Sequence, residues 1–181
     1  MKETFMRPIV LALAVAACTS DGDSLNDADV EFLQGVIPHH GQAVVMAEMV
    51  EAATTRPELR DLAEGIIATQ TEEITLMTDL LEQSGEDAPS ADMTGSDHGG
   101  MQMMAGMMTD ADMAAMQTRT AIDFDVMFAE SMIAHHQGAV DAAEVVLPEG
   151  RHPAVRELAL AVIEAQTAEI DQLESWVEAW T

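Results

Sequence analysis

Two pairs of adjacent histidines are the residues of this sequence best suited to chemistry. His39-His40 and His135-His136 each interrupt a run of apolar residues that recur every three or four positions. A buried polar group must be hydrogen-bonded or bound to a ligand, and neutral imidazole is a common metal ligand, so both pairs predict a metal site. The alternative is structural: core histidines paired with glutamines that fix the register of the helices.

A methionine-rich stretch lies between the histidine pairs. Residues 93–116 contain eight of the 15 methionines, flanked by glycine and aspartate, which favour a loop over a core helix. A thioether is a soft, uncharged ligand that selects soft ions, above all Cu(I), and hardly binds magnesium or calcium. The alternative is that methionine is a flexible core filler here. The residues expected to bind copper, with Cu(I) favoured over Cu(II), are His98, Met101, Met103, Met104, Met107 and Met108.

Two further methionines share the helix face of the histidines. Met132 lies one turn before His135, and Met46 lies two turns after His39. Their sulfurs are placed either to complete a mixed histidine–methionine site or to fill the core. We therefore count both among the candidate metal ligands.

An internal repeat defines the elements that position these side chains. Residues 29–81 align without gaps to residues 125–177, and 20 of these 53 positions are identical. Each half has the apolar stripes of two amphipathic helices with a break between them, at residues 54–57 and 148–150. The sequence therefore predicts an all-α fold, an antiparallel four-helix bundle over residues 29–181. The bundle is built from a duplicated helical hairpin and carries a Met-rich insert at about residues 82–124.

The second helix of each half also has polar residues within its apolar stripe. Antiparallel helices rise equally from their turn, so counting residues from the break places Gln70 beside His40 and Gln166 beside His136. We expect these side chains to be hydrogen-bonding neighbours of the metal ligands. A glutamate follows one turn later in each half, at the edge of the same level: Glu73 and Glu169.

The N-terminal residues predict export. Residues 1–17 have the basic flank and short apolar run of a signal peptide, too short to span a bilayer. The run ends in Val15-Ala16-Ala17-Cys18, which is similar to a bacterial lipoprotein cleavage site and predicts lipidation of Cys18. The alternative is an ordinary secretory signal in which the cysteine is incidental. Residues 18–28 then form a flexible tether, and the mature protein is lipid-anchored at the cell envelope or periplasmic.

The acidic composition limits the classes of partner. The formal net charge is −26, which repels nucleic-acid phosphates and anionic lipids and attracts cations. We therefore expect a metal ion as partner, no nucleic acid, and membrane contact only through the lipid anchor. The sequence does not identify a protein partner.

Several motifs resemble the bacterial domain of unknown function 305 family over residues 29–177. They are VIPHHGQAVVMA, MIAHHQGAVDAAE, IIATQTEEI, VIEAQTAEI and GMMTDADMAAM. The resemblance implies a ferritin-like four-helix fold and export, and a role like that of the periplasmic copper-binding members linked to copper resistance. It also implies metal binding by the four paired histidines and by methionines of the linker. Family members commonly have Met-Ala after each histidine pair; Met46-Ala47 keeps it but Ala142-Ala143 does not, so we expect the second half to bind differently or more weakly.

The function that the sequence favours is a cell-envelope copper-binding protein, acting as a buffer, scavenger or chaperone and not as an enzyme. A ferritin-like metal oxidoreductase is less favoured, because it normally requires Glu-x-x-His on its helices. The residues three positions before each paired histidine are instead Val36, Ile37, Met132 and Ile133. The other alternative is a non-catalytic helical interaction module with structural core histidines.

Overall fold

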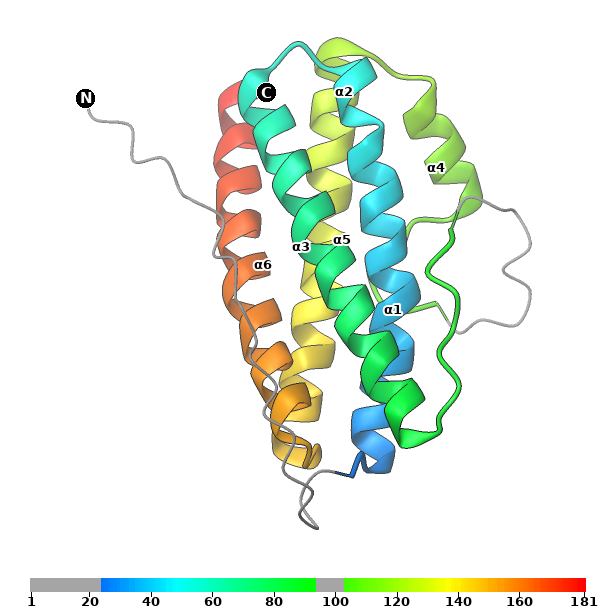
Figure 1. Ribbon diagram of the computed structural model, residues 1–181. Coiled ribbons are helices and arrows are strands. Elements are labelled where there is room, and N and C mark those ends of the chain that lie inside the picture. Colours follow the sequence, from blue (N-terminus) through cyan, green and yellow to red (C-terminus); the bar gives the residue numbers. More distant parts are fainter. Residues whose placement is uncertain (1–23, 94–102) are drawn as a thin grey trace.

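The computed structural model describes residues 24–93 and 103–181, and the regular elements within these ranges are all helices. Four long helices form an antiparallel bundle, as predicted (Figure 1). None of the helices in the described ranges combines the length and apolarity needed to cross a bilayer. The elements are α1 (Asp27–Glu48), α2 (Val50–Ala53), α3 (Pro57–Ser84), α4 (Asp110–Gln117), α5 (Ala121–Glu149) and α6 (Pro153–Trp180).

Proline begins the second helix of each hairpin. Pro57 and Pro153 occupy the start of α3 and α6, where the missing N–H costs no helical hydrogen bond. The first break lies where the periodicity predicts it, but the second lies later, because Pro148 is still within α5. The buried carboxylate of Asp29 accepts the backbone N–H groups of Arg151 and His152 and so fixes the turn there.

A buried aspartate at the start of each repeat closes the loop of the other hairpin. Asp29 performs this role at one end of the bundle by binding the α5–α6 turn. At the other end, Asp125 Oδ2 accepts a hydrogen bond of 2.8 Å from Nε of Arg56, in the loop before α3. The Arg56 guanidinium also lies over the ring of Trp180, 4.3 Å from its centroid. The two hairpins are thus joined at both ends by polar contacts of equivalent residues.

The apolar core is divided into two half-cores along the bundle. Along α1 and the start of α2, the first half-core contains residues 32–37 and the second contains residues 43–50, with the histidine pair between them. The same division recurs on α5, on either side of the other pair. Between the half-cores lies a polar layer, which comprises His39, His40, Gln70, Glu73, His135, His136, Gln166 and Glu169.

The described parts of the insert, residues 85–93 and 103–120, pass along the side of the bundle formed by α1 and α5, and the second part contains α4 (Figure 1). Glycines allow its backbone to approach the helices closely. A Cβ atom on Gly41 would overlap with the carbonyl oxygen of Ala91, and one on Gly138 would overlap with that of Ala105. Gly106 has a φ of 81° and lies against the Ala134 carbonyl of α5. The described part of the insert is therefore packed directly on the bundle, at the level of the histidines.

Candidate metal centre

The four paired histidines lie side by side in the middle of the bundle, each with no solvent exposure. The rings of His39 and His135 are nearest, with centroids 3.8 Å apart and planes inclined by 37°. His40 lies 6.3 Å from His39, and His136 lies 6.5 Å from His135, measured between ring centroids. The arrangement brings both repeats to one site, with His40 and His136 on the outside.

Each outer histidine contacts a glutamate. Nε2 of His40 lies 2.9 Å from Oε2 of Glu73, and Nε2 of His136 lies 2.7 Å from Oε2 of Glu169. The first contact is a hydrogen bond; the second has the distance of an ion pair without hydrogen-bond angles. Both glutamates are more than four-fifths buried, so water screens these contacts little.

The glutamines of the polar layer are buried but do not have the expected role. The Oε1 atoms of Gln70 and Gln166 lack hydrogen-bond partners, and so does Nδ1 of His40. Counting from the turn gives the level only to within one helical turn, and the glutamate one turn on is the stronger acceptor because it is charged. The partner of His40 is therefore Glu73 and not Gln70.

The histidine layer has more hydrogen-bonding atoms than partners. Nδ1 of all four imidazoles is buried without a partner, and Nε2 of His135 is too. An unpaired buried polar atom is destabilising by about 1–3 kcal/mol. Several such atoms in one layer indicate a place for a ligand that accepts nitrogen lone pairs.

The two central histidines are held neutral. Burial, with a smaller electrostatic effect from the neighbouring His40, lowers the pKa of His39 from 6.5 to about 3. Burial and the neighbouring histidines also lower the pKa of His135 well below its ordinary value. A neutral imidazole keeps one nitrogen lone pair at neutral pH, which is the form that binds metals.

The nitrogen donors do not converge on a common point. In residues 24–93 and 103–181, no three His, Cys, Asp or Glu side chains are arranged to hold a metal ion. His39 and His135 instead lie ring against ring. A bound ion would therefore require rotation of an imidazole, a sulfur ligand, or both.

Methionine side chains lie in the half-cores that border the histidine layer. Met46 and Met132 are fully buried in the second half-core, and Met108 of the insert is packed in the same cluster. Met104 lies against Gly35 of α1, and Met107 is half-buried. Met103 is exposed, with 42% of its surface accessible. The candidate residues His98, Met101 and Cys18 lie outside the described residues.

Sequence reasoning missed the residue that holds the insert in place. Gln42 is buried and makes two hydrogen bonds to the backbone of Met108, donating to its carbonyl at 2.9 Å and accepting from its N–H at 2.7 Å. One signal was present: the residues after the histidines are Gly41-Gln42 in the first half but Gln137-Gly138 in the second. Gln137 is exposed and donates a hydrogen bond to Asp141 on its own helix. Of these two glutamines, therefore, only Gln42 binds the insert.

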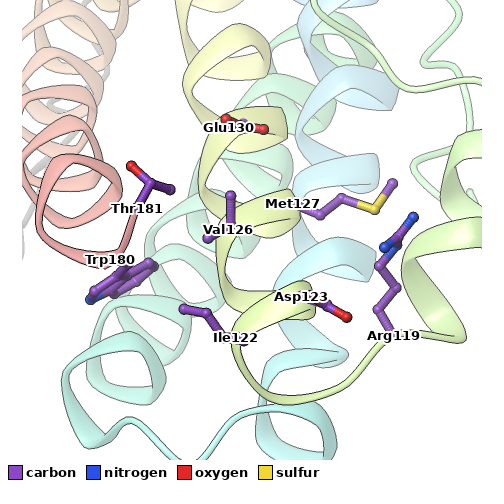
Figure 2. Close-up of a pocket in the computed structure, with 8 residues that line it drawn as sticks. All are labelled: Arg119, Ile122, Asp123, Val126, Met127, Glu130, Trp180 and Thr181. Atoms are coloured by element: carbon purple, nitrogen blue, oxygen red, sulfur yellow. The ribbon is translucent and has the colours of Figure 1, made fainter.

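A surface pocket of about 410 Å³ lies near the start of α5, apart from the polar layer (Figure 2). Its lining includes Ile122, Met127 and Trp180, together with Arg119 and Glu130. None of its lining residues is a histidine, and the pocket therefore belongs to a different part of the surface from the candidate metal centre.

Known proteins resemble the whole bundle. A presumed secreted DUF305 protein from Streptomyces coelicolor is 28% identical, with a TM-score of 0.75, over 89% of this chain and 96% of that one. CopM in its Cu(II)-bound form is 34% identical, with a TM-score of 0.71, over 84% of this chain and 97% of that one. CopM has also been solved with Cu(I) and with silver.

A curated relative matches only a part of the chain. The uncharacterised protein L153 of Acanthamoeba polyphaga mimivirus is 36% identical over 55 residues, which are 30% of this chain and 36% of that protein. The chain thus spans about a third of that relative. The model of the family described as domain of unknown function (DUF305) matches residues 29–177, which include both repeats and the polar layer. The chain therefore belongs to the DUF305 family.

Proposed function

We propose that this protein binds copper in the cell envelope and holds it as cargo, as a buffer, scavenger or chaperone. The observation that carries the proposal is the layer of four buried histidines, in which each Nδ1 atom lacks a hydrogen-bond partner. Two of these histidines are neutral because burial lowers the pKa of each. Such a layer is destabilising when empty and suits a cation that binds imidazole nitrogen.

The glutamates support this proposal. A carboxylate that accepts the N–H of a metal-binding histidine fixes the tautomer and makes the other nitrogen a stronger ligand. Glu73 is in that position for His40, which leaves Nδ1 of His40 with the lone pair. Glu169 lies equally close to His136 in the second repeat.

The choice of copper, and of Cu(I) over Cu(II), depends on sulfur. Met46, Met132 and Met108 lie in the half-core next to the polar layer, and thioethers bind Cu(I) in preference to hard cations. The copper-bound and silver-bound forms of CopM support a soft-metal role for a bundle of this family. Met103, Met104 and Met107 would add sulfur from the insert.

Export and lipidation form part of the proposal. The likeness to a presumed secreted relative supports an exported protein. Anchoring through Cys18 depends on the lipoprotein-type motif of the N-terminus. Mass spectrometry of the mature protein would detect a lipid on Cys18, and an unmodified N-terminus elsewhere would contradict it.

We favour a binding role over catalysis and over a purely structural role. The histidines have no solvent exposure, which suits retention of an ion better than access of a substrate. The structural alternative requires histidines satisfied by glutamines, whereas Gln70 Oε1 and His40 Nδ1 both lack partners. The second half of the layer differs from the first in two contacts. Nε2 of His135 lacks a partner like the Ala105 carbonyl beside His39, and the contact between His136 and Glu169 lacks hydrogen-bond angles.

The decisive experiment is a Cu(I) titration of residues 19–181 against a competing chelator under reducing conditions, with Zn(II) for comparison. We expect tight Cu(I) binding and weak Zn(II) binding. The double variant His39→Ala/His135→Ala should lose Cu(I) affinity and keep its helical circular dichroism. The variant His152→Ala is the control, because that histidine caps α6 far from the layer. Unchanged Cu(I) affinity in the double variant would show that the histidines of the bundle do not bind the metal.

A further inference from the structure

The insert contacts the histidine layer through its backbone. The carbonyl oxygen of Ala105 lies 3.3 Å from Nε2 of His39 and against Gly138 of α5. A carbonyl oxygen only accepts hydrogen bonds, so this contact requires the proton of His39 to be on Nε2. Nδ1 of His39 then keeps the lone pair, as Nδ1 of His40 does opposite Glu73.

The position of Ala105 depends on contacts from both helices. Gln42 of α1 binds the Met108 backbone with two hydrogen bonds in a buried setting. On α5, Gly138 provides the space that the Ala105 carbonyl occupies, and Gly106 turns the chain with a positive φ. The segment 105–108 is therefore fixed between α1 and α5 by features that the repeats do not share.

We propose that Gln42 is a positioning residue for the metal centre. It holds the insert so that the Ala105 carbonyl sets the tautomer of His39 and directs Nδ1 of His39 toward the bound ion. The Ala105 carbonyl accepts the Nε2–H of His39, as the Glu73 carboxylate accepts that of His40. This inference rests on the proposed copper site for its functional meaning, but its structural part is testable without metal.

The first test reads the tautomer in the metal-free protein. Long-range ¹H–¹⁵N correlation spectra of residues 19–181 distinguish Nε2–H from Nδ1–H for each histidine. We expect His39 and His40 both to be Nε2–H in the wild type. In Gln42→Ala, His39 should lose its single tautomer while His40 keeps it, and the Met108 amide should exchange with solvent about tenfold faster or more.

Two further variants make the result interpretable. Gly138→Ala places a Cβ atom where the Ala105 carbonyl lies and so displaces that carbonyl from the α5 side. Because alanine also raises the helix propensity of α5, this variant tests the tautomer of His39 even if Gln42→Ala does not fold. Gln137→Ala is the matched control, because this exposed glutamine bonds only within α5. It should leave both tautomers and the Met108 exchange rate unchanged.

The functional test is Cu(I) affinity of the same variants. Loss of a group that orients a ligand weakens metal binding by about 10–100-fold, so Gln42→Ala and Gly138→Ala should weaken it by that order. A wild-type His39 with the proton on Nδ1, or a tautomer unchanged in both variants, would overturn the inference. A shifted tautomer with unaltered affinity would overturn the role of Gln42 at the metal centre. A wild type that does not bind Cu(I) would instead overturn the proposed function, with the tautomer result unaffected.

Discussion

His39 and His135 meet ring against ring at the centre of the bundle, with centroids 3.8 Å apart, although 96 residues separate them in the chain. Both are fully buried and held neutral, and neither Nδ1 atom has a hydrogen-bond partner. Two polar rings in contact between two apolar half-cores are a poor way to stabilise a bundle. Their presence is best explained by a ligand.

Replacing both central histidines by leucine should therefore not destabilise the metal-free protein. The substitution removes three unpaired ring nitrogens from the core at similar volume, against the loss of one long hydrogen bond from His39 to the Ala105 carbonyl. The free energy of unfolding of His39→Leu/His135→Leu should therefore be unchanged or higher by about 1–2 kcal/mol. Urea denaturation measures it. Leu33→Ala, in the first half-core, should lower the same quantity by about 2–5 kcal/mol and provides the reference for a true core residue. A large loss in the leucine double variant would favour the structural role for the histidines.

The stability of the metal-free protein should depend on pH through the same residues. The unfolded chain protonates His39 near pH 6.5, whereas the folded chain does so only near pH 3. The free energy of unfolding should therefore fall as the pH drops between these values, by about 1.4 kcal/mol per pH unit for each such histidine, and His39 should contribute no pH dependence above 6.5. Urea denaturation from pH 7 to pH 4 tests this. The leucine double variant retains all the carboxylates. A smaller dependence of its free energy of unfolding on pH would therefore assign the difference from the wild type to the two histidines, whereas an equal dependence would contradict this prediction.

The carboxylate of Glu73 should matter for copper affinity through His40. Glu73→Gln keeps an acceptor oxygen but removes the charge, and the weaker hydrogen bond to Nε2 of His40 makes Nδ1 a poorer ligand. We expect Cu(I) affinity to fall about tenfold in a chelator competition. Glu72→Gln makes the same change of charge at the exposed neighbouring position and should have no such effect. Equal losses in the two variants would assign the effect to the overall charge of the protein.

The buried carboxylate of Asp29 should contribute to stability but not to metal binding. It accepts backbone hydrogen bonds from both its own helix start and the α5–α6 turn, and bonds to a charged acceptor contribute about 1.5–3 kcal/mol. Asp29→Asn should lower the free energy of unfolding by about that amount, measured by urea denaturation. Asp27→Asn, at an exposed position in the same turn, is the control. Altered Cu(I) affinity in folded Asp29→Asn would indicate coupling between this end of the bundle and the polar layer.

The fold could be predicted from the sequence because its determinants are local and repeated. The apolar periodicity, the prolines that begin α3 and α6, and the repeat itself define the helices and their order. The level of the polar layer follows from counting residues along antiparallel helices. The partner of His40 was less accessible, because Gln70 and Glu73 are one turn apart and only the packed structure distinguishes them.

The path of the insert could not be predicted, because it depends on contacts between distant segments. On the insert, both the approach of Ala105 to Gly138 and the hydrogen bonds between Met108 and the Gln42 side chain are made by backbone atoms, which are the same for every residue type. The exchange of glycine and glutamine between the repeats is visible in the sequence. The consequence of this exchange can be recognised only once the insert is seen to lie between α1 and α5.

The methionines of the half-core next to the histidine layer provide the sharpest test of the choice of metal. Met46 and Met132 are fully buried in the second half-core, and leucine matches methionine in volume, so Met46→Leu/Met132→Leu should change the free energy of unfolding by less than about 1.5 kcal/mol per site. If these sulfurs bind copper, Cu(I) affinity should fall while the weak Zn(II) affinity stays the same, because thioethers are soft ligands. Met77→Leu, buried in the first half-core, makes the same chemical change there and should leave Cu(I) affinity intact. Chelator competition measures the Cu(I) affinity of the double variant and of Met77→Leu. An equal affinity in both would show that Met46 and Met132 are packing residues, and the histidines and the insert would then remain as the copper ligands.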